Sequence, residues 1–140
     1  MYSVKVADEF KQNPHWYSIF VDFYNYKLCG DLPDYFGKDV PEDDFKGTFW
    51  HMHLTQDPKR VSEWSKTLDQ NSRTNRLDPP NDFYLLYGKD TFQEEYLLLD
   101  IIGPAAHDRN KWRSYIGKLN TTVIEPWLQG KRKYDEEPDQ

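Results

Sequence analysis

The sequence predicts an α+β fold in which a small antiparallel sheet packs against helices. Apolar residues recur every three or four positions in three segments, as in amphipathic helices, and alternate or cluster in four shorter segments, as in strands. Two of the strand segments, 83–87 and 96–102, flank a turn-rich stretch at Gly88, which favours a hairpin. A chain of 140 residues fits one domain. We expect this domain to span residues 1–130 and residues 131–140 to form a disordered charged tail.

The N-terminal part carries a strand pattern and then a helix pattern. Residues 2–6 alternate between apolar and polar, which predicts a short strand with one buried face. Asn13 followed by Pro14 is typical of a helix start, because asparagine caps free amides and proline has none to satisfy. Gly30 can take the left-handed conformation that ends such a helix. Residues 31–47 carry prolines, glycines and six carboxylates, which predicts a long surface loop.

The middle and the end of the chain repeat these signals. Residues 49–55 alternate as a strand, and the 96–102 segment is so apolar that we expect it to be central in the sheet. Asp57-Pro58 predicts a second helix start, with apolar positions at Val61, Trp64 and Leu68. Residues 69–81 are expected to form a polar loop. A last helix is predicted over residues 106–128, where Pro126 should kink or fray the final turn.

The predicted strand 49–55 carries two histidines. Strand alternation places His51 and His53 on one face, so both imidazoles can point into one pocket. Two groups that titrate near neutral pH suit general acid–base chemistry. A metal site is an alternative, but the chain has no second cysteine, no His-Glu-x-x-His motif and no regular carboxylate spacing to complete one. A merely solvated or hydrogen-bonded pair is the third reading.

Further candidates lie in the second half of the chain. Residues 59–133 hold 13 basic and 10 acidic side chains, so a phosphate-binding surface is expected there, including Arg109 and Arg113. His107 lies at the start of the last predicted helix, where the helix dipole favours an anion. Tyr87 ends a strand and is a candidate contact to phosphate. A polar cluster that could grip a phosphate comprises Ser72, Arg73, Thr74 and Asn75.

Composition also indicates the cellular compartment of the protein and the partners that it is not expected to bind. Cys29 is the only cysteine, so no internal disulfide can form. No apolar run approaches the roughly 20 residues that span a bilayer, and the first residues do not resemble an export leader. We therefore expect a cytoplasmic protein that does not bind membranes. The net charge of −6 argues against nonspecific binding of nucleic acid, and DNA binding by the chain itself is not expected.

Several ordered segments resemble signatures of the YafO-type toxins of bacterial type II toxin–antitoxin modules. The resemblance covers roughly residues 22–118. It rests on segments 32–39, 51–54, 72–75, 85–87 and 96–102, continued by Pro104, His107 and residues 116–117. Five segments in the same order are much more specific than any one of them.

This resemblance implies a toxin that cuts mRNA on the ribosome and is silenced by a cognate antitoxin protein. The YafO-type toxins are similar to the RelE-like ribosome-dependent RNases, which fold as a small antiparallel sheet packed against helices. Cleavage of that kind needs no metal or other cofactor, because the 2′-hydroxyl of the RNA is the nucleophile. We expect His51 and His53 to act as base or acid, Arg73 to clamp the phosphate, and His107 to be a second proton-transfer group.

Two alternatives stay open from the sequence. A RelE-like module could inhibit a partner protein without cutting RNA, and a hydrolase could use His51 and His53 as metal ligands. The overall acidity departs from the basic charge that is common in toxins that dock on ribosomal RNA. The acidic stretch 42–44 is therefore expected to contact a basic antitoxin or a ribosomal protein.

Overall fold

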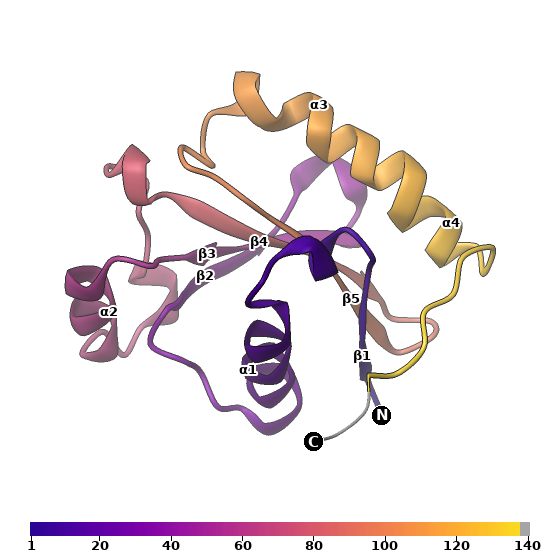
Figure 1. Ribbon diagram of the computed structural model, residues 1–140, viewed down its shortest axis with the longest axis horizontal. Helices are drawn as coiled ribbons and strands as arrows, with labels where there is room; N and C mark the ends of the chain where they lie inside the picture. Colours follow the sequence, from indigo (N-terminus) through magenta and orange to yellow (C-terminus); the bar gives the residue numbers. More distant parts are fainter. Residues whose placement is uncertain (138–140) are drawn as a thin grey trace.

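The computed structural model describes residues 1–137 and shows a five-stranded sheet with helices on both faces (Figure 1). The strands are β1 (Ser3–Val6), β2 (Phe36–Pro41), β3 (Phe49–Leu54), β4 (Phe83–Asp90) and β5 (Glu95–Ile102). Their order is β1-β5-β4-β3-β2. The α+β fold class is confirmed, but the sheet is mixed, because β1 pairs with β5 in parallel while the other neighbours are antiparallel.

Two separate cores lie on the two faces of the sheet. The helices are α1 (Trp16–Cys29), α2 (Pro58–Ser65), α3 (Arg109–Leu119) and α4 (Glu125–Leu128). In Figure 1, α1 lies below the sheet, and α3 and α4 lie above it. Strand alternation divides β4 between them: Leu85 and Tyr87 join the core under α1, whereas Tyr84 and Leu86 join the core under α3. Each large side chain buried in this way contributes roughly 1.5–3 kcal/mol to folding.

The N-terminal predictions are confirmed, with a shift at the helix start. Val4 and Val6 of β1 are buried. The Asn13 side chain accepts a hydrogen bond from the His15 amide at 2.8 Å, so asparagine closes a turn just before α1 begins. Gly30 takes the left-handed conformation, with φ of 76°, and ends the helix as predicted.

The prediction of one long loop over residues 31–47 is wrong. This segment contains β2 and the short 3-10 turn η2 (Asp43–Phe45). β2 is an edge strand, which tolerates proline and charge because only one side of its backbone must pair. Pro41 is its last residue, and its pairing with β3 is irregular between Phe36 and Asp39. Residues 31–47 have the composition of a loop, but part of this segment forms the edge strand of the sheet.

The second helix and the hairpin follow the predictions closely. The Asp57 side chain caps α2 by accepting a hydrogen bond from the Lys59 amide at 3.2 Å, and Trp64 is buried. Leu68 is 96% exposed because α2 ends at Ser65, so its assignment to the apolar stripe is wrong. The hairpin of β4 and β5 forms, and β5 lies inside the sheet between β4 and β1. The turn lies later than predicted, at residues 91–94, because residues 88–90 continue β4 and pair with β5.

The single helix predicted at the C-terminal end is interrupted. It begins later than predicted, after Asp108, whose side chain caps α3. A π-helical stretch, η5 (Asn120–Ile124), separates α3 from α4. Pro126 has no amide to offer the carbonyl of Thr122, and that carbonyl instead accepts a hydrogen bond from Arg132 at 3.1 Å. The π-helical stretch and the hydrogen bond from Arg132 therefore accommodate the proline.

The described part of the predicted tail, residues 131–137, lies against the N-terminal region and is not detached from the fold. Lys11 forms an ion pair with Glu137 at 2.6 Å. Tyr134 packs against the core under α3. The rest of the predicted tail, residues 138–140, lies outside the described residues.

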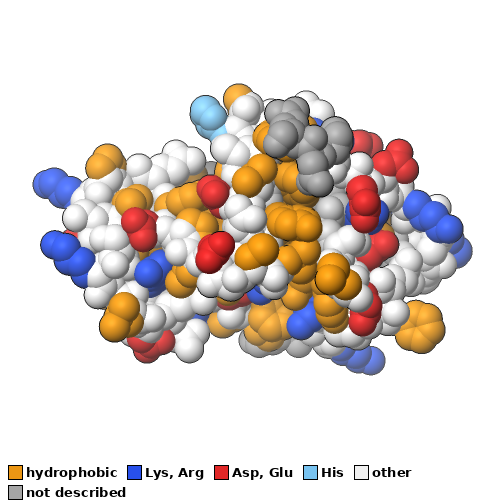
Figure 2. Space-filling model, turned by 90° about the horizontal axis from the view of Figure 1, so that it is seen from below, with side chains coloured by type: hydrophobic (Ala, Val, Ile, Leu, Met, Phe, Trp, Pro, Cys, Tyr) orange, Lys and Arg blue, Asp and Glu red, His pale blue; other side chains and the backbone are white. Residues whose placement is uncertain are grey.

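The α1 side of the molecule leaves apolar surface exposed. Figure 2 views this side and shows a band of hydrophobic side chains across the middle of the molecule, with basic side chains toward its two ends. Tyr24 of α1, for example, is 40% exposed. Within residues 1–137, no helix has the length and apolar character needed to cross a bilayer.

Candidate active site

A cleft of about 760 Å³ opens on the α3 side of the sheet. Two neighbouring strands form its floor: His51 and His53 project from β3, and Tyr84 projects from β4. The walls come from β2, from residues 71–76, and from the segment that leads into α3. The two histidines of the predicted strand therefore face one cavity, on the side opposite the core under α1.

Three imidazoles surround the ring of Tyr84. His53 lies directly opposite Tyr84 in the antiparallel register of β3 and β4. The ring of His51 stacks on Tyr84 with centroids 4.1 Å apart, and the rings of His53 and His107 lie 5.0 and 4.9 Å from it. The rings of His53 and His107 are 5.0 Å apart. The structure thus brings together three histidines that the sequence singled out. It adds Tyr84, which the strand register alone could have revealed.

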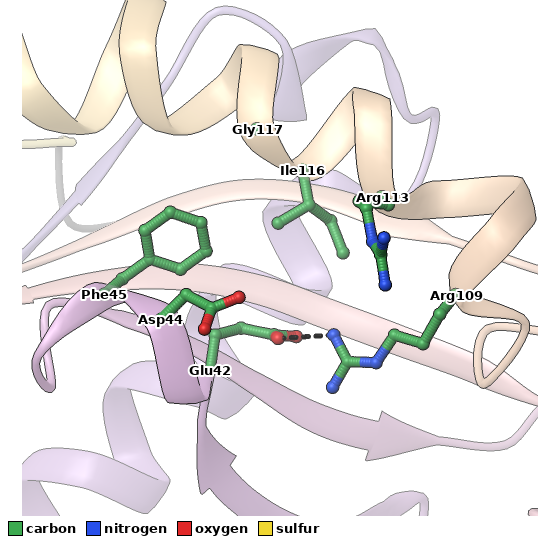
Figure 3. Close-up of a pocket in the computed structure, with 7 residues that line it drawn as sticks. All are labelled: Glu42, Asp44, Phe45, Arg109, Arg113, Ile116 and Gly117. Atoms are coloured by element: carbon green, nitrogen blue, oxygen red, sulfur yellow. Dashed lines mark hydrogen bonds and ion pairs between the residues drawn. The ribbon is translucent and has the colours of Figure 1, made fainter.

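A buried carboxylate holds His51. Glu42, at the end of β2, is 3% exposed, and its Oε1 lies 2.8 Å from His51 Nδ1. Its Oε2 accepts a hydrogen bond from Arg109 at 2.8 Å, an ion pair visible in Figure 3. Burial raises the pKa of Glu42, but the hydrogen bonds from His51 and Arg109 outweigh it and lower the pKa below its usual value. The prediction that Glu42 belongs to an acidic docking surface is wrong, because its side chain lies inside the protein.

A second buried carboxylate holds His107. Asp82 is 1% exposed, and its Oδ2 lies 2.6 Å from His107 Nδ1 and accepts the His107 amide at 2.9 Å. In both pairs the carboxylate takes Nδ1–H, so Nε2 is left as the nitrogen that exchanges a proton with a ligand. Asp82 lies among polar loop residues in the sequence, where nothing marks it as the partner of a histidine 25 positions later.

The third imidazole has a different environment. Burial, followed by the nearby His51 and His107, lowers the pKa of His53 to about 3. Its Nδ1 is buried and has no hydrogen-bond partner among residues 1–137. His53 is therefore neutral at physiological pH and available for hydrogen bonding to a ligand.

Cationic side chains line the same cleft. Lys38 of β2, Arg76 of the loop before β4, and Arg109 at the start of α3 reach it from three different elements. The cleft thus combines groups that exchange protons with groups that attract an anion. This combination suits transfer of a phosphoryl group.

Comparison with known proteins shows the family of this chain. The family model described as "Toxin YafO, type II toxin-antitoxin system" matches residues 24–127, which include every residue that lines the cleft. This chain belongs to the YafO family of toxins. The protein named mRNA interferase toxin YafO, from Escherichia coli (strain K12), is 33% identical over 112 residues. That match covers 70% of this chain and 76% of the relative.

Membership of the YafO family confirms the resemblance found in the sequence. A toxin of a type II toxin–antitoxin system has an antitoxin partner, so this part of the partner prediction is also supported. No solved structure matches the chain. The specific likeness to RelE-like RNases therefore stays a prediction, whereas the α+β class is a finding.

Arg73, predicted to clamp the phosphate, lies outside the cleft of this YafO-family toxin. Its side chain is buried, and the guanidinium donates hydrogen bonds to the backbone carbonyls of Thr67, Pro33 and Phe36 at 3.0 to 3.1 Å. Arg73 therefore stabilises the backbone before and at the start of β2, and it does not line the cleft. Arg76, three residues later in the same loop, does line the cleft.

Other predicted phosphate contacts are divided between the cleft and the scaffold. Thr74 lines the cleft. Ser72 instead donates a hydrogen bond to Asp69. Asn75 is buried and donates to the carbonyls of Leu54 and Asn81. Neither Ser72 nor Asn75 lines the cleft, and their predicted contacts to the substrate stay predictions.

Tyr87 also lies away from the candidate site of this YafO-family toxin. It is fully buried in the core under α1, and its hydroxyl donates a hydrogen bond to Asp39 at 2.6 Å. An irregularity in the pairing of β4 with β5 falls just before it. The tyrosine that faces the cleft is Tyr84, on the opposite side of the same strand.

The remaining predicted residues, Arg109 and Arg113, lie on α3. Arg109 lines the histidine cleft and also a second, smaller pocket, in which Arg113 lies (Figure 3). Within residues 1–137, no group of three or more His, Cys, Asp or Glu side chains is arranged to hold a metal ion.

Proposed function

We propose that this YafO-family toxin is an mRNA interferase that cleaves RNA in the histidine cleft. One observation carries the proposal: two imidazoles, each held by a buried carboxylate, face one cleft together with a neutral imidazole and cationic side chains. The name of the Escherichia coli relative, an mRNA interferase toxin, supports the same activity.

The chemistry requires three functions in one place. A base removes the proton of the ribose 2′-hydroxyl, the 2′-oxygen bonds to phosphorus, and the bond from phosphorus to the 5′-oxygen breaks. An acid protonates that leaving 5′-oxygen, and cations stabilise the charge on the crowded phosphate. The products carry a 2′,3′-cyclic phosphate and a 5′-hydroxyl. Nothing in this sequence of steps needs a metal, and we propose a metal-independent reaction.

We assign the two proton transfers to His51 and His107. Each has Nδ1 fixed by a carboxylate, Glu42 or Asp82, which orients the ring and leaves Nε2 to exchange a proton with the RNA. One of them begins the cycle neutral as the base, and the other begins protonated as the acid. Which is which depends on the side from which the RNA enters.

His53 and Tyr84 have supporting roles in this proposal. The lowered pKa of His53 keeps it neutral, so it contacts the substrate by hydrogen bonding and not by charge. Burial is the main cause that raises the pKa of Tyr84 above its ordinary value, so its hydroxyl keeps its proton and can donate to a phosphate oxygen. Arg76, Lys38 and Arg109 replace Arg73 as the groups that bind the phosphate.

We also propose that cleavage takes place on the ribosome, in the cytoplasm, with mRNA as substrate. The cationic side chains that line the cleft, Lys38, Arg76 and Arg109, support binding of RNA at this place in spite of the net charge of −6. We propose that the ribosome presents the mRNA to them. Contact with a membrane or with DNA is not part of the proposal.

The test is to express the wild-type chain and single variants in bacteria and to map the ends of the transcripts. His51→Ala and His107→Ala should lower cleavage by about 10²-fold to 10⁴-fold, the usual contribution of a general acid or base. His15→Ala is the matched control, because His15 is an exposed histidine before α1, outside the cleft.

The chemical nature of the ends decides the mechanism. Fragments ending in 2′,3′-cyclic phosphate support it, whereas fragments with 3′-hydroxyl ends contradict it. Growth arrest with intact transcripts would overturn the proposed activity and favour a toxin that acts by binding alone.

A further inference from the structure

A second pocket, of about 330 Å³, lies beside the histidine cleft, and the proposed reaction does not use it. It is enclosed between the turn η2 and helix α3 (Figure 3). Arg109 lines both cavities, and the ion pair of Arg109 with Glu42 lies where they meet. A chain that threads the cleft would therefore place its next unit in this pocket.

Two apolar side chains line the pocket from opposite sides. Phe45 projects into it from η2, and Ile116 projects from α3 (Figure 3). Gly117 continues the α3 wall, where a Cβ would meet no atom within 4 Å, so the space beside Ile116 is open. A flat, apolar face, such as that of a nucleobase, fits between such walls, because RNA bases are commonly bound by stacking on protein side chains.

The polar groups of the pocket are a carboxylate and a guanidinium. Asp44 lies on η2 and Arg113 on α3, and both line the pocket. Among the side chains that the structure describes, no ion pair joins Asp44 or Arg113 to another residue. Their hydrogen-bonding capacity is therefore available to a ligand that reaches both. Arg109, by contrast, is engaged with Glu42.

We propose that this pocket binds a guanine base of the RNA, at a nucleotide next to the cleaved bond. Guanine presents two neighbouring donors, N1–H and N2–H, that match one carboxylate such as Asp44. It also presents two neighbouring acceptors, O6 and N7, that match one guanidinium such as Arg113. Adenine lacks the N1–H donor, and the pyrimidines lack N7. The assignment rests on the proposed function, because it identifies the neighbour of the scissile phosphate.

Binding of mononucleotides tests the pocket without any need for cleavage. The purified chain is titrated with guanosine, adenosine, cytidine and uridine monophosphates, and the amide signal of Gly117 is followed by NMR. Guanosine monophosphate should bind at least about fivefold more tightly than the other three, since one bidentate contact discriminates by about 1–3 kcal/mol. Asp44→Asn and Arg113→Ala should each remove that preference. Lys118→Ala, which removes an exposed charge of α3 outside the pocket, should retain it.

Mapping of cleavage sites in cells separates this proposal from the proposed function. Wild-type toxin should cut with guanine enriched at least about fivefold at one nucleotide flanking the cut, and Arg113→Ala should cut without that enrichment. Cleavage with no base preference, together with equal binding of the four mononucleotides, would overturn the guanine site and leave the nuclease intact. Selective guanosine binding without RNA cleavage would support the site and refute the nuclease.

Discussion

Replacing His53 by glutamine should make the fold less sensitive to acid. The imidazole is 4% exposed, and burial lowers its pKa to about 3, against 6.5 for an ordinary histidine. Below pH 6.5 the unfolded chain takes up a proton at this position that the folded chain refuses until about pH 3. The associated stability is therefore complete above pH 6.5 and is lost as the pH falls toward 3.

The size of the effect follows from the same values. Each pH unit below 6.5 lowers the free energy of unfolding by about 1.4 kcal/mol, so the change from pH 7 to pH 5 costs the wild type about 2 kcal/mol. His53→Gln cannot show this loss, because glutamine does not titrate. The lowered pKa of Glu42 keeps its carboxylate ionised over this range, so its titration does not interfere.

Urea denaturation at pH 7, 6 and 5 measures the difference. The wild type should lose about 2 kcal/mol more than His53→Gln between pH 7 and pH 5, and His15→Gln, at an exposed site, should behave like the wild type. Equal losses in the wild type and in His53→Gln would refute the view that His53 is buried as a neutral imidazole.

Three further predictions concern the scaffold and the cleft. Arg73→Ala should lower the free energy of unfolding by about 3 kcal/mol, because a buried guanidinium and its hydrogen bonds to three backbone carbonyls are lost, whereas Arg76→Ala should change it by less than about 0.5 kcal/mol and instead reduce RNA cleavage. Urea denaturation and transcript mapping distinguish these two arginines, and the reverse pattern would restore Arg73 as the phosphate clamp. Gly88→Ala should cost about 1–3 kcal/mol in denaturation, since its Cβ would lie 2.7 Å from the ring of Trp127; a variant of unchanged stability would contradict this close packing. Asp82→Asn should lower cleavage about tenfold or more while the protein stays folded by circular dichroism, and full activity would show that the carboxylate is not needed.

Patterns within short stretches of sequence made part of this structure predictable. The strand period of two fixes which side chains share a face, and it placed His51 and His53 together without knowledge of the sheet. The cap at Asp57 and the left-handed Gly30 are likewise decided by residues within a few positions of them. These features depend on short-range geometry, which the sequence states directly.

The carboxylates of the site depend on longer-range pairing. Glu42 meets His51 only because the edge strand β2 folds back along β3, and that strand looked like a loop by composition. Asp82 meets His107 across 25 residues of hairpin and connecting chain. Before the strand pairings are known, neither carboxylate differs from the other acidic residues of the chain.

The sequence alone could not show which of two arginines lines the cleft. Arg73 and Arg76 lie in one polar loop and have the same chemistry. Arg73 turns inward and donates to the backbone carbonyls of Pro33 and Phe36, before and at the start of β2, whereas Arg76 lines the cleft. Only the path of a distant backbone segment decides which guanidinium becomes structural.

The place of β5 between β1 and β4 has a consequence for synthesis. β1 is the first strand that the ribosome makes and β5 the last, so β5 has to insert between two strands that already exist. Pairing across so much intervening chain is slow relative to local folding. His107 follows β5 in the chain, so a nascent chain lacks one of the three imidazoles of the histidine cleft until all five strands have been made.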